Sequence, residues 1–328
     1  MNFQWHLTNR CNLRCLHCYQ SEFQDPASVD LLALASRLLS DLEARGASGV
    51  INITGGEPLM LAEELYRLLA VLETARPVTE LMIITNGLLL DRESIDRLAA
   101  FSKLSTIKIS LEGASSRSND RIRGRGVFRK ALEALRRTRD SGRFQVIVMN
   151  TLTPDNIDEV VPLLELVEEE SFHGLIIERF IPEGQGRNLR DGILSPAEWR
   201  DFVTTLVECC DMDSSLADLA PYRAFWIRPG QGDREILGAA CNLGESFCIM
   251  PEGTLLPCRR FLYPLGNLIG ESLWDIVGRS PLLEEVRDRN RLQGKCRTCR
   301  HESCYGCRAL GYACYRDPFA EDFLCFEK

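Results

Sequence analysis

Short apolar runs alternate with longer amphipathic stretches along the first half of the chain. The runs are rich in Ile, Val and Thr, and they read FQWHLT, GVINIT, ELMIIT, TIKISL, FQVIVM and GLIIERF. Such runs are typical of buried parallel strands. Between the first two, Leu31, Leu34, Leu38 and Leu42 recur at helical spacing before a stop at Gly46. The alternation predicts a parallel sheet with helices outside it.

The pattern changes after residue 186. Six strands are too few for a closed eight-stranded barrel, so we expect an open sheet. Ser195, Pro196 and Glu198 form a capping box with proline at the first helical position, which predicts a helix through about Cys210. From Cys241 onward the chain is rich in Cys, Gly and Arg, which is typical of a small domain organised by metal.

Three cysteines follow the first predicted strand in the string CNLRCLHC, at Cys11, Cys15 and Cys18. A [4Fe–4S] cluster held by thiolates normally takes four of them, so this triplet leaves one iron open to another ligand. Zinc, a redox dithiol or plain buried thiols are the alternatives. The recurrence of the triplet with GGEP, SLEG and eight further cysteines of constrained spacing favours the cluster.

Each further motif follows a predicted strand. GGEP comes after the second strand, TNG after the third and SLEG after the fourth. In parallel α/β folds the functional residues lie in loops at the carboxyl ends of the strands. We therefore expect these motifs to meet the cysteine triplet at one edge of the sheet.

The composition excludes some classes of function. The 328 residues hold 39 Lys and Arg against 47 Asp and Glu, a net charge of −8 with no basic stripe for nucleic acid. No signal peptide is apparent, and no apolar run approaches the ~18 residues of a membrane span, so we expect a cytoplasmic protein without a membrane partner. In a reducing compartment, 14 cysteines favour metal or redox chemistry over disulfides.

Together these motifs resemble those of radical S-adenosylmethionine (SAM) enzymes, and the C-terminal cysteines resemble the SPASM domain. The resemblance implies an α/β fold, an open (β/α)6 partial TIM-like barrel followed by a small Cys-rich SPASM domain. It places the barrel at residues 1–190, a helical connection at 191–234 and the SPASM domain at 235–328. In this family SAM chelates the open iron. One electron from the cluster then breaks a C–S bond of SAM and yields a 5′-deoxyadenosyl radical.

The same resemblance implies SAM contacts at Gly55, Gly56 and Glu57. Glycines without Cβ let the backbone approach the methionyl amino group closely, and Glu57 accepts hydrogen bonds from that ammonium. His17 stands where the family usually has an aromatic ring over the adenine. As a lone histidine, it is equally compatible with a purely structural role.

Further cofactor contacts are expected at Ser110, Glu112 and Arg123. Ser110 and Glu112 match a polar pair near the ribose and sulfonium, although the family more often has Asp at the second position. Arg123 resembles the arginine that pairs with the cofactor carboxylate, for which a guanidinium fork is well shaped. Arg121 and Arg125 remain alternatives for that role.

The eight ligand positions of a SPASM domain with two auxiliary clusters are all present. The resemblance assigns Cys241, Cys248, Cys258 and Cys307 to the first auxiliary cluster, and Cys296, Cys299, Cys304 and Cys325 to the second. Three [4Fe–4S] clusters are thus expected. The spacings from Cys299 to Cys304 and from Cys304 to Cys307 are each one residue shorter than the usual family pattern. Ligand swapping and an open coordination site are therefore two alternatives to full ligation. Two zinc sites are the competing interpretation.

Three cysteines remain. Cys209 and Cys210 fall on a predicted amphipathic helix and are expected in its core. Cys314, in GYACYRD, is a weak candidate for a catalytic hydrogen-atom donor or a substitute ligand. Tyr222 and its neighbours Phe225 and Trp226 either contact a substrate or pack between domains, and packing is favoured.

The leading functional hypothesis is an oxidoreductase-type maturase of a ribosomally made peptide or protein, acting by crosslinking, epimerisation or side-chain oxidation. Its expected partners are the substrate, an electron donor such as flavodoxin or ferredoxin, and a separate leader-binding protein. The alternatives are tailoring of a tetrapyrrole or another small-molecule precursor, and a non-catalytic metal-binding scaffold.

Overall fold

The computed structural model describes residues 1–328 except 27–28, 211–214, 231–233, 242 and 328. The N-terminal part alternates strands and helices: β1 (Asn2–His6), α1 (Leu31–Ala44), β2 (Gly49–Thr54), α2 (Glu63–Thr74), β3 (Val78–Thr85), α3 (Arg92–Leu98), β4 (Leu104–Ser110), α4 (Ser116–Arg123), α5 (Val127–Asp140), β5 (Gln145–Leu152), α6 (Val160–Glu169) and β6 (Gly174–Arg179). Single turns of 3₁₀ helix lie at Pro58–Leu61 and Ile157–Glu159, and a longer 3₁₀ segment covers Gly184–Gly192.

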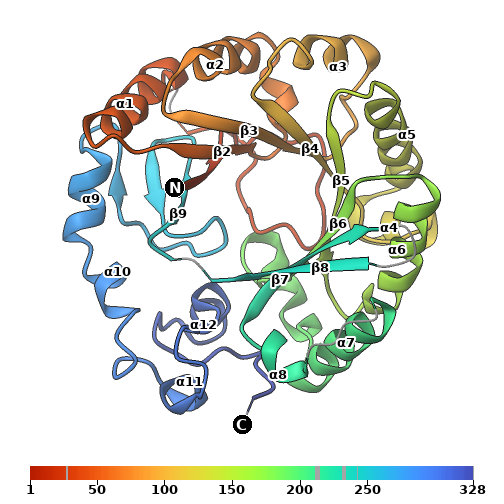
Figure 1. Ribbon diagram of the computed structural model, residues 1–328, viewed down its shortest axis with the longest axis vertical. Coiled ribbons are helices and arrows are strands. Elements are labelled where there is room, and N and C mark those ends of the chain that lie inside the picture. Colours follow the sequence, from red (N-terminus) through yellow and green to blue (C-terminus); the bar gives the residue numbers. More distant parts are fainter. Residues whose placement is uncertain (27–28, 211–214, 231–233, 242, 328) are drawn as a thin grey trace.

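The C-terminal part has shorter elements. They are α7 (Pro196–Cys209), α8 (Leu216–Leu219), β7 (Tyr222–Pro229), β8 (Arg234–Ala240), β9 (Ser246–Ile249), β10 (Thr254–Leu256), β11 (Gly266–Asn267), α9 (Leu273–Arg279), α10 (Pro281–Glu285), α11 (Gly294–Thr298) and α12 (Arg308–Tyr315). In Figure 1 the strands surround the centre of the molecule and the helices form an outer ring.

All the described strands belong to one sheet of eleven, in the order β11-β10-β9-β1-β2-β3-β4-β5-β6-β7-β8. Strands β1 to β6 are parallel neighbours, as the alternating pattern predicts. The sheet has β11 and β8 at its edges, so among the described residues it stays open rather than closing into a barrel. This confirms the expected partial TIM-like barrel.

The predicted helical face of α1 packs on this sheet. Leu34, Leu38 and Leu42 are buried in the core, and Leu31 at the first turn is half-buried. Asp30 caps the helix by accepting hydrogen bonds from two backbone N–H groups of the first turn. The leucines that recur at helical spacing therefore lie on the buried face of α1.

The Cys-rich region is joined to the barrel more closely than the sequence suggests. Strand β9 pairs in parallel with β1, so the sheet continues from the barrel into the C-terminal part. Strand β1 would otherwise expose one row of unpaired backbone groups as an edge strand. The pairing gives the cysteines of the C-terminal region a fixed position relative to the barrel.

The 191–234 connection, expected to be helical, also contains a strand. The Ser195 capping box opens α7 as predicted, but Tyr222, Phe225 and Trp226 lie on β7, antiparallel to β6. The Phe225 ring contacts Trp199 and Phe202 of α7, with centroids 5.9 Å from each. Phe225 thus serves packing, because alternate side chains of β7 face the core.

Of the helices in the part of the chain that the structure describes, none is long and apolar enough to cross a membrane.

Candidate functional site

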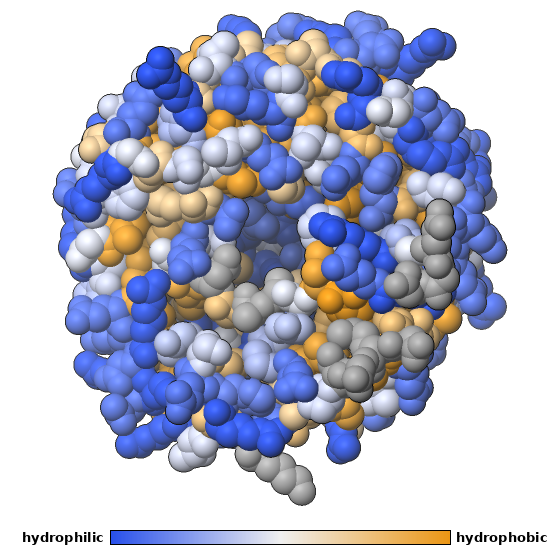
Figure 2. All heavy atoms as spheres, in the orientation of Figure 1, coloured by the Kyte–Doolittle hydropathy of each residue, from blue (hydrophilic) through white to orange (hydrophobic). Residues whose placement is uncertain are grey.

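A cavity lies at the carboxyl ends of the barrel strands, where the motifs were expected to meet. The predicted site residues that line it are Cys11, Cys15, Cys18, Gly55, Gly56, Ser110, Glu112 and Arg123. Figure 2 shows a hollow at the centre of one face, with hydrophilic residues inside it. One cavity therefore brings together three cysteines and five of the six expected cofactor contacts.

The two glycines of GGEP hold the start of the cysteine loop. Gly56 N donates to Thr8 O at 2.6 Å. A Cβ added to Gly56 would lie 2.3 Å from Arg10 O, and one added to Gly55 would lie 2.8 Å from Thr8 O. Contacts under about 3 Å are not tolerated by real side chains. The glycines therefore allow two backbone segments to touch, a role beyond the cofactor approach expected from the sequence.

Glu57 does not line this cavity and departs from the expectation. Its carboxylate is fully buried and accepts hydrogen bonds from Thr85 Oγ1 at 2.7 Å, Asn86 N at 2.8 Å and Leu59 N at 3.2 Å. Burial raises the pKa of Glu57. Its oxygens are bound within the fold, because the loop after β3 needs acceptors for its own N–H and O–H groups. Glu57 thus connects two loops of the site.

The TNG loop after β3 has a role that the sequence only partly indicates. Asn86 Nδ2 donates to Asn12 Oδ1 at 2.7 Å and lies 3.9 Å from Cys11 Sγ. The only sign of this role in the sequence was that TNG follows a predicted strand, where functional loops lie in parallel α/β folds. This loop supports the cysteine loop from the side.

Glu112 is the centre of a buried ion cluster. Its Oε1 lies 3.0 Å from Arg123 Nε and 2.9 Å from His17 Nε2, and its Oε2 accepts from Thr151 N at 2.8 Å. Burial alone would raise the pKa of Glu112, but the charges of His17 and Arg123 and the hydrogen bonds lower it to about 2. Glu112 is therefore ionised at neutral pH and orients both the Arg123 guanidinium and the His17 imidazole.

Arg123 carries an unpaired donor at the cavity. Its side chain is 9% exposed, and its Nη1 is buried without a hydrogen-bond partner. A buried guanidinium nitrogen without a partner is costly unless an anionic ligand completes it. Arg121 instead contacts Asp155 at the surface, and Arg125 is exposed. The geometry favours Arg123 among the three candidates.

The three N-terminal cysteines are half-buried, and burial raises the pKa of each thiol, for Cys18 to about 11. A metal cation would supply the charge that makes the thiolate stable there. A further segment that the sequence did not single out supports them: Gly186 N donates to Cys18 O at 2.9 Å, and Gly184, with φ +58°, packs against the backbone of Tyr19. In the sequence, Gly184 and Gly186 marked only the point where the alternation of strands and helices stops.

A second cavity lies on the side of the C-terminal region. Cys241, Cys258 and Cys307 line it, and the fourth expected ligand, Cys248, is buried on β9. Burial raises the pKa of Cys241 and of Cys248 to about 12 in each case. Three of the four cysteines that the family resemblance assigns to the first auxiliary cluster thus line one cavity.

Of the other four expected ligands, Cys296 and Cys325 lie near a buried carboxylate, Asp322. Asp322 N donates to Cys296 Sγ at 3.3 Å, and Asp322 Oδ2 accepts from Cys307 N at 3.0 Å. Arg223 Nη2 lies 2.9 Å from Cys304 Sγ, and Arg223 Nε lies 3.3 Å from Asp322 Oδ2. This carboxylate joins the two expected auxiliary ligand groups.

Burial alone would raise the pKa of Asp322, but the guanidinium groups of Arg179 and Arg223 lower it. Arg179 Nη1 lies 2.9 Å from Asp322 Oδ2. Because residues from β6, β7 and the C-terminal segment meet here, no sequence signal pointed to this cluster.

Cys209 and Cys210, expected in the core, are half-buried and buried respectively. Cys314 is half-buried on α12 and lines neither of the two cavities. Among the residues the structure describes, no group of three or more His, Cys, Asp or Glu could hold a single metal ion.

Two known protein families match this chain. Residues 5–167 match the radical SAM superfamily, and residues 241–300 match the SPASM iron–sulfur cluster-binding domain. The chain belongs to the radical SAM superfamily. Its two domains imply SAM and iron–sulfur clusters as cofactors.

Relatives of this radical SAM protein include heme synthases and mycofactocin maturases. It is 27% identical to the AdoMet-dependent heme synthase of Nitratidesulfovibrio vulgaris, over 99% of this chain and 91% of that protein. It is 28% identical to the mycofactocin maturase MftC of Mycobacterium ulcerans, over 92% of this chain and 81% of that protein. The structure of anSMEcpe with bound AdoMet has the same fold, with a TM-score of 0.75 at 16% identity, covering 99% of this chain and 93% of that one.

Proposed function

We propose that this protein uses SAM and three [4Fe–4S] clusters to abstract a hydrogen atom from a peptide, as a maturase. The observation that carries the proposal is the single cavity that joins Cys11, Cys15 and Cys18 to Arg123 with its unpaired Nη1. Three thiols and an unpaired guanidinium suit an iron–sulfur cluster and the carboxylate of its ligand.

The first cluster would be held by the three N-terminal cysteines, in a domain at 1–190. Gly55, Gly56 and Ser110 line the same cavity and would contact SAM. When bound, cluster and SAM supply the 5′-deoxyadenosyl radical, and the protein binds, orients and shields it. Arg123 would hold the SAM carboxylate, and Glu112 would keep the Arg123 guanidinium oriented through the 3.0 Å contact.

The auxiliary clusters would lie in the domain at 235–328, on the eight cysteines assigned above. The Arg223 guanidinium and the backbone N–H of Asp322 would donate hydrogen bonds to two of these thiolates, because the structure has these donors against Cys304 and Cys296. Hydrogen bonds to cluster sulfurs are one means by which proteins set reduction potentials. A flavodoxin or ferredoxin would supply electrons, and a separate protein would bind the substrate's leader.

Two substrate classes compete. A peptide is supported by similarity to the mycofactocin maturases. A tetrapyrrole is supported by similarity to the heme synthases, which share a greater part of their length with this chain. Both classes use the same cavity and the same cofactor residues.

The test is anaerobic reconstitution of the purified protein with iron and sulfide. We expect about twelve irons per chain, by the four-iron content of each cluster, and deoxyadenosine from SAM and dithionite. Peptides encoded beside the gene and iron coproporphyrin III are then supplied separately, and the products are read by mass spectrometry. A protein that binds only zinc and forms no deoxyadenosine would contradict the proposal and favour a metal-binding scaffold.

A further inference from the structure

Two consecutive arginines reach the interior of the barrel from the loop between β10 and β11. Arg259 Nη2 lies 3.5 Å from Glu178 Oε2, and Arg260 Nη2 lies 3.3 Å from Glu178 Oε1. Glu178 belongs to β6, so the contact joins the barrel to the C-terminal region. All three residues line both cavities described above. They form the wall that the two cavities share.

Positive charge exceeds negative charge at this wall. Glu178 faces two guanidinium groups, and Lys108 of β4 lines the same second cavity. Burial and, more weakly, the Glu112 carboxylate would raise the pKa of Glu178, but Arg260, Arg259 and Lys108 lower it, so three cations act on the Glu178 carboxylate. A buried surplus of this kind is unfavourable unless an anion completes it.

Arg259 is the less satisfied of the pair. It is 8% exposed, and its Nε is buried with no hydrogen-bond partner. Its Nη1 reaches Thr54 Oγ1 only at 3.3 Å. Arg260, by contrast, donates to Arg179 O at 2.7 Å. The Arg259 guanidinium therefore retains unused donor capacity.

The position of Arg259 relates it to the cofactor residues. Its guanidinium carbon lies 4.9 Å from the ring centroid of Tyr19, which follows Cys18 in sequence. Thr54, its hydrogen-bond partner, immediately precedes Gly55. An anion bound by Arg259 and Arg260 would thus lie beside the expected SAM site, on the side facing Cys258.

We propose that Arg259 and Arg260 bind a carboxylate group of the substrate and so position it beside the SAM site; this inference rests on the proposed function. A guanidinium pair matches a carboxylate by charge and by bidentate geometry. The carboxylate belongs to an acidic side chain or the C-terminus of a peptide, or to a propionate of a tetrapyrrole. Loss of the two guanidinium groups would weaken substrate binding without affecting cofactor binding.

A second role for the same charges is compensation of the auxiliary cluster at Cys258. That role makes a different prediction, because removing a positive charge next to a cluster lowers its reduction potential. It predicts no preference for a free carboxylate over its ester. The two roles are therefore separated by binding data and potentials taken together.

The experiment uses the reconstituted protein and two matched pairs of probes. These are iron coproporphyrin III with its tetramethyl ester, and the neighbouring-gene peptide with its methyl-esterified form. Binding is followed by absorbance for the porphyrins and by fluorescence anisotropy of a labelled peptide. We expect one acid to bind roughly 10- to 100-fold more tightly than its ester, the range for hydrogen bonds to charged groups. The pair that shows the preference identifies the source of the carboxylate.

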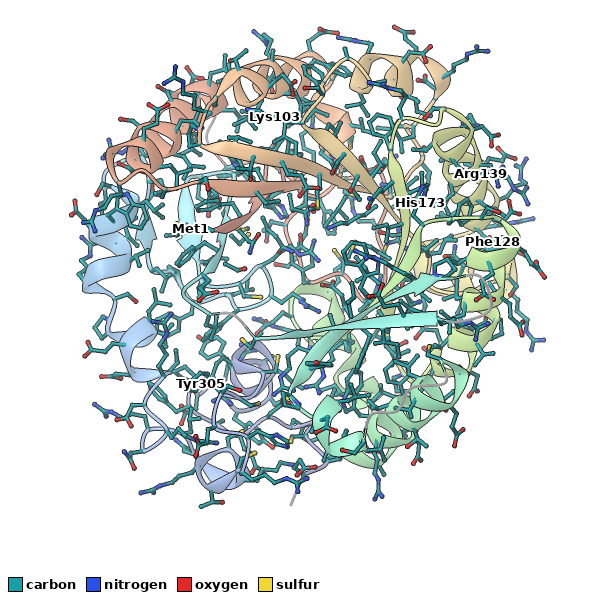
Figure 3. The ribbon with its side chains drawn as sticks, viewed as in Figure 1. Met1, Lys103, Phe128, Arg139, His173 and Tyr305 are labelled. Carbon is teal, nitrogen blue, oxygen red and sulfur yellow. The ribbon has the colours of Figure 1, made fainter. Side chains whose placement is uncertain are left out.

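Variants Arg259→Gln and Arg260→Gln should remove that preference, and the iron content of each variant is measured to check that its clusters are assembled. Arg139→Gln is the matched control, because Arg139 also pairs with a carboxylate, Glu170, but lies on α5 at the rim of the molecule (Figure 3). Equal binding of acid and ester by the wild-type protein, or binding of neither acid, overturns the inference, and so does a variant with unchanged preference and a shifted cluster potential. Absence of deoxyadenosine from the wild type would instead overturn the proposed function.

Discussion

Removal of the Glu112 charge should destabilise the protein in a pH-dependent way. The Glu112 carboxylate is 1% exposed and contacts Arg123 and His17. Its pKa is lowered from 4.5 to about 2 despite burial, because of these cations and the hydrogen bonds. A difference of this size between the unfolded and folded pKa contributes about 3 kcal/mol to the free energy of unfolding at pH 7.

The sign follows from the direction of the change. Because the folded pKa lies below the unfolded pKa, the contribution is complete above pH 4.5 and is lost as the pH falls from 4.5 towards 2. At pH 3 about 1 kcal/mol should remain. The substitution Glu112→Gln keeps the size of the side chain and an acceptor oxygen, but it removes the charge.

The assay is urea unfolding of iron-free, reduced protein at pH 7 and pH 3, followed by circular dichroism. We expect Glu112→Gln to lower the free energy of unfolding by about 3 kcal/mol at pH 7 and by about 1 kcal/mol at pH 3. Glu63→Gln, which removes an exposed partner of Arg97, should match the wild type at both pH values. A loss that is the same at both pH values would refute the electrostatic explanation.

Three further predictions concern the loops and the core. Gly56→Ala should cost the protein about four irons, the content of one cluster, because its Cβ would collide with the backbone at Arg10; iron analysis tests this, and Gly278→Ala, where nothing lies within 4 Å, should keep full iron content. Leu38→Ala should lower the free energy of unfolding by about 2–5 kcal/mol, since Leu38 is fully buried; a loss well under 1 kcal/mol in urea unfolding would contradict its place in the core. Cys314→Ala should leave product unchanged, because Cys314 does not line the cavity of Cys11, Cys15 and Cys18; a loss of product would revive its role as hydrogen donor, and a loss of iron its role as ligand.

The sequence predicted the elements whose signals are local. Apolar runs marked β1 to β6, leucines at helical spacing marked α1, and Ser195 with Glu198 marked the start of α7. Strand order then placed the motif loops at one edge, because parallel strands end on the same side. For this reason eight of the predicted site residues line one cavity.

Partner choice was not predictable in the same way. The Glu57 carboxylate was expected to face the cofactor, yet it binds Thr85 and Asn86, because the loop after β3 comes close enough to use both oxygens. Among three arginines on one segment, only the packing of α4 brings Arg123 to the cavity. Neither outcome has a counterpart in residue spacing.

The amino-acid sequence by itself determined the family-specific chemistry: a cysteine triplet behind the first strand, eight further thiols, and an alternating sheet to carry them. The tertiary structure alone decided that β9 continues the barrel sheet and that Arg259 and Arg260 meet Glu178 across about 80 residues of chain. The physical reason is range. Hydrophobic periodicity and ligand spacing act over a few residues, whereas contacts between distant segments depend on strand register and on packing of the whole sheet.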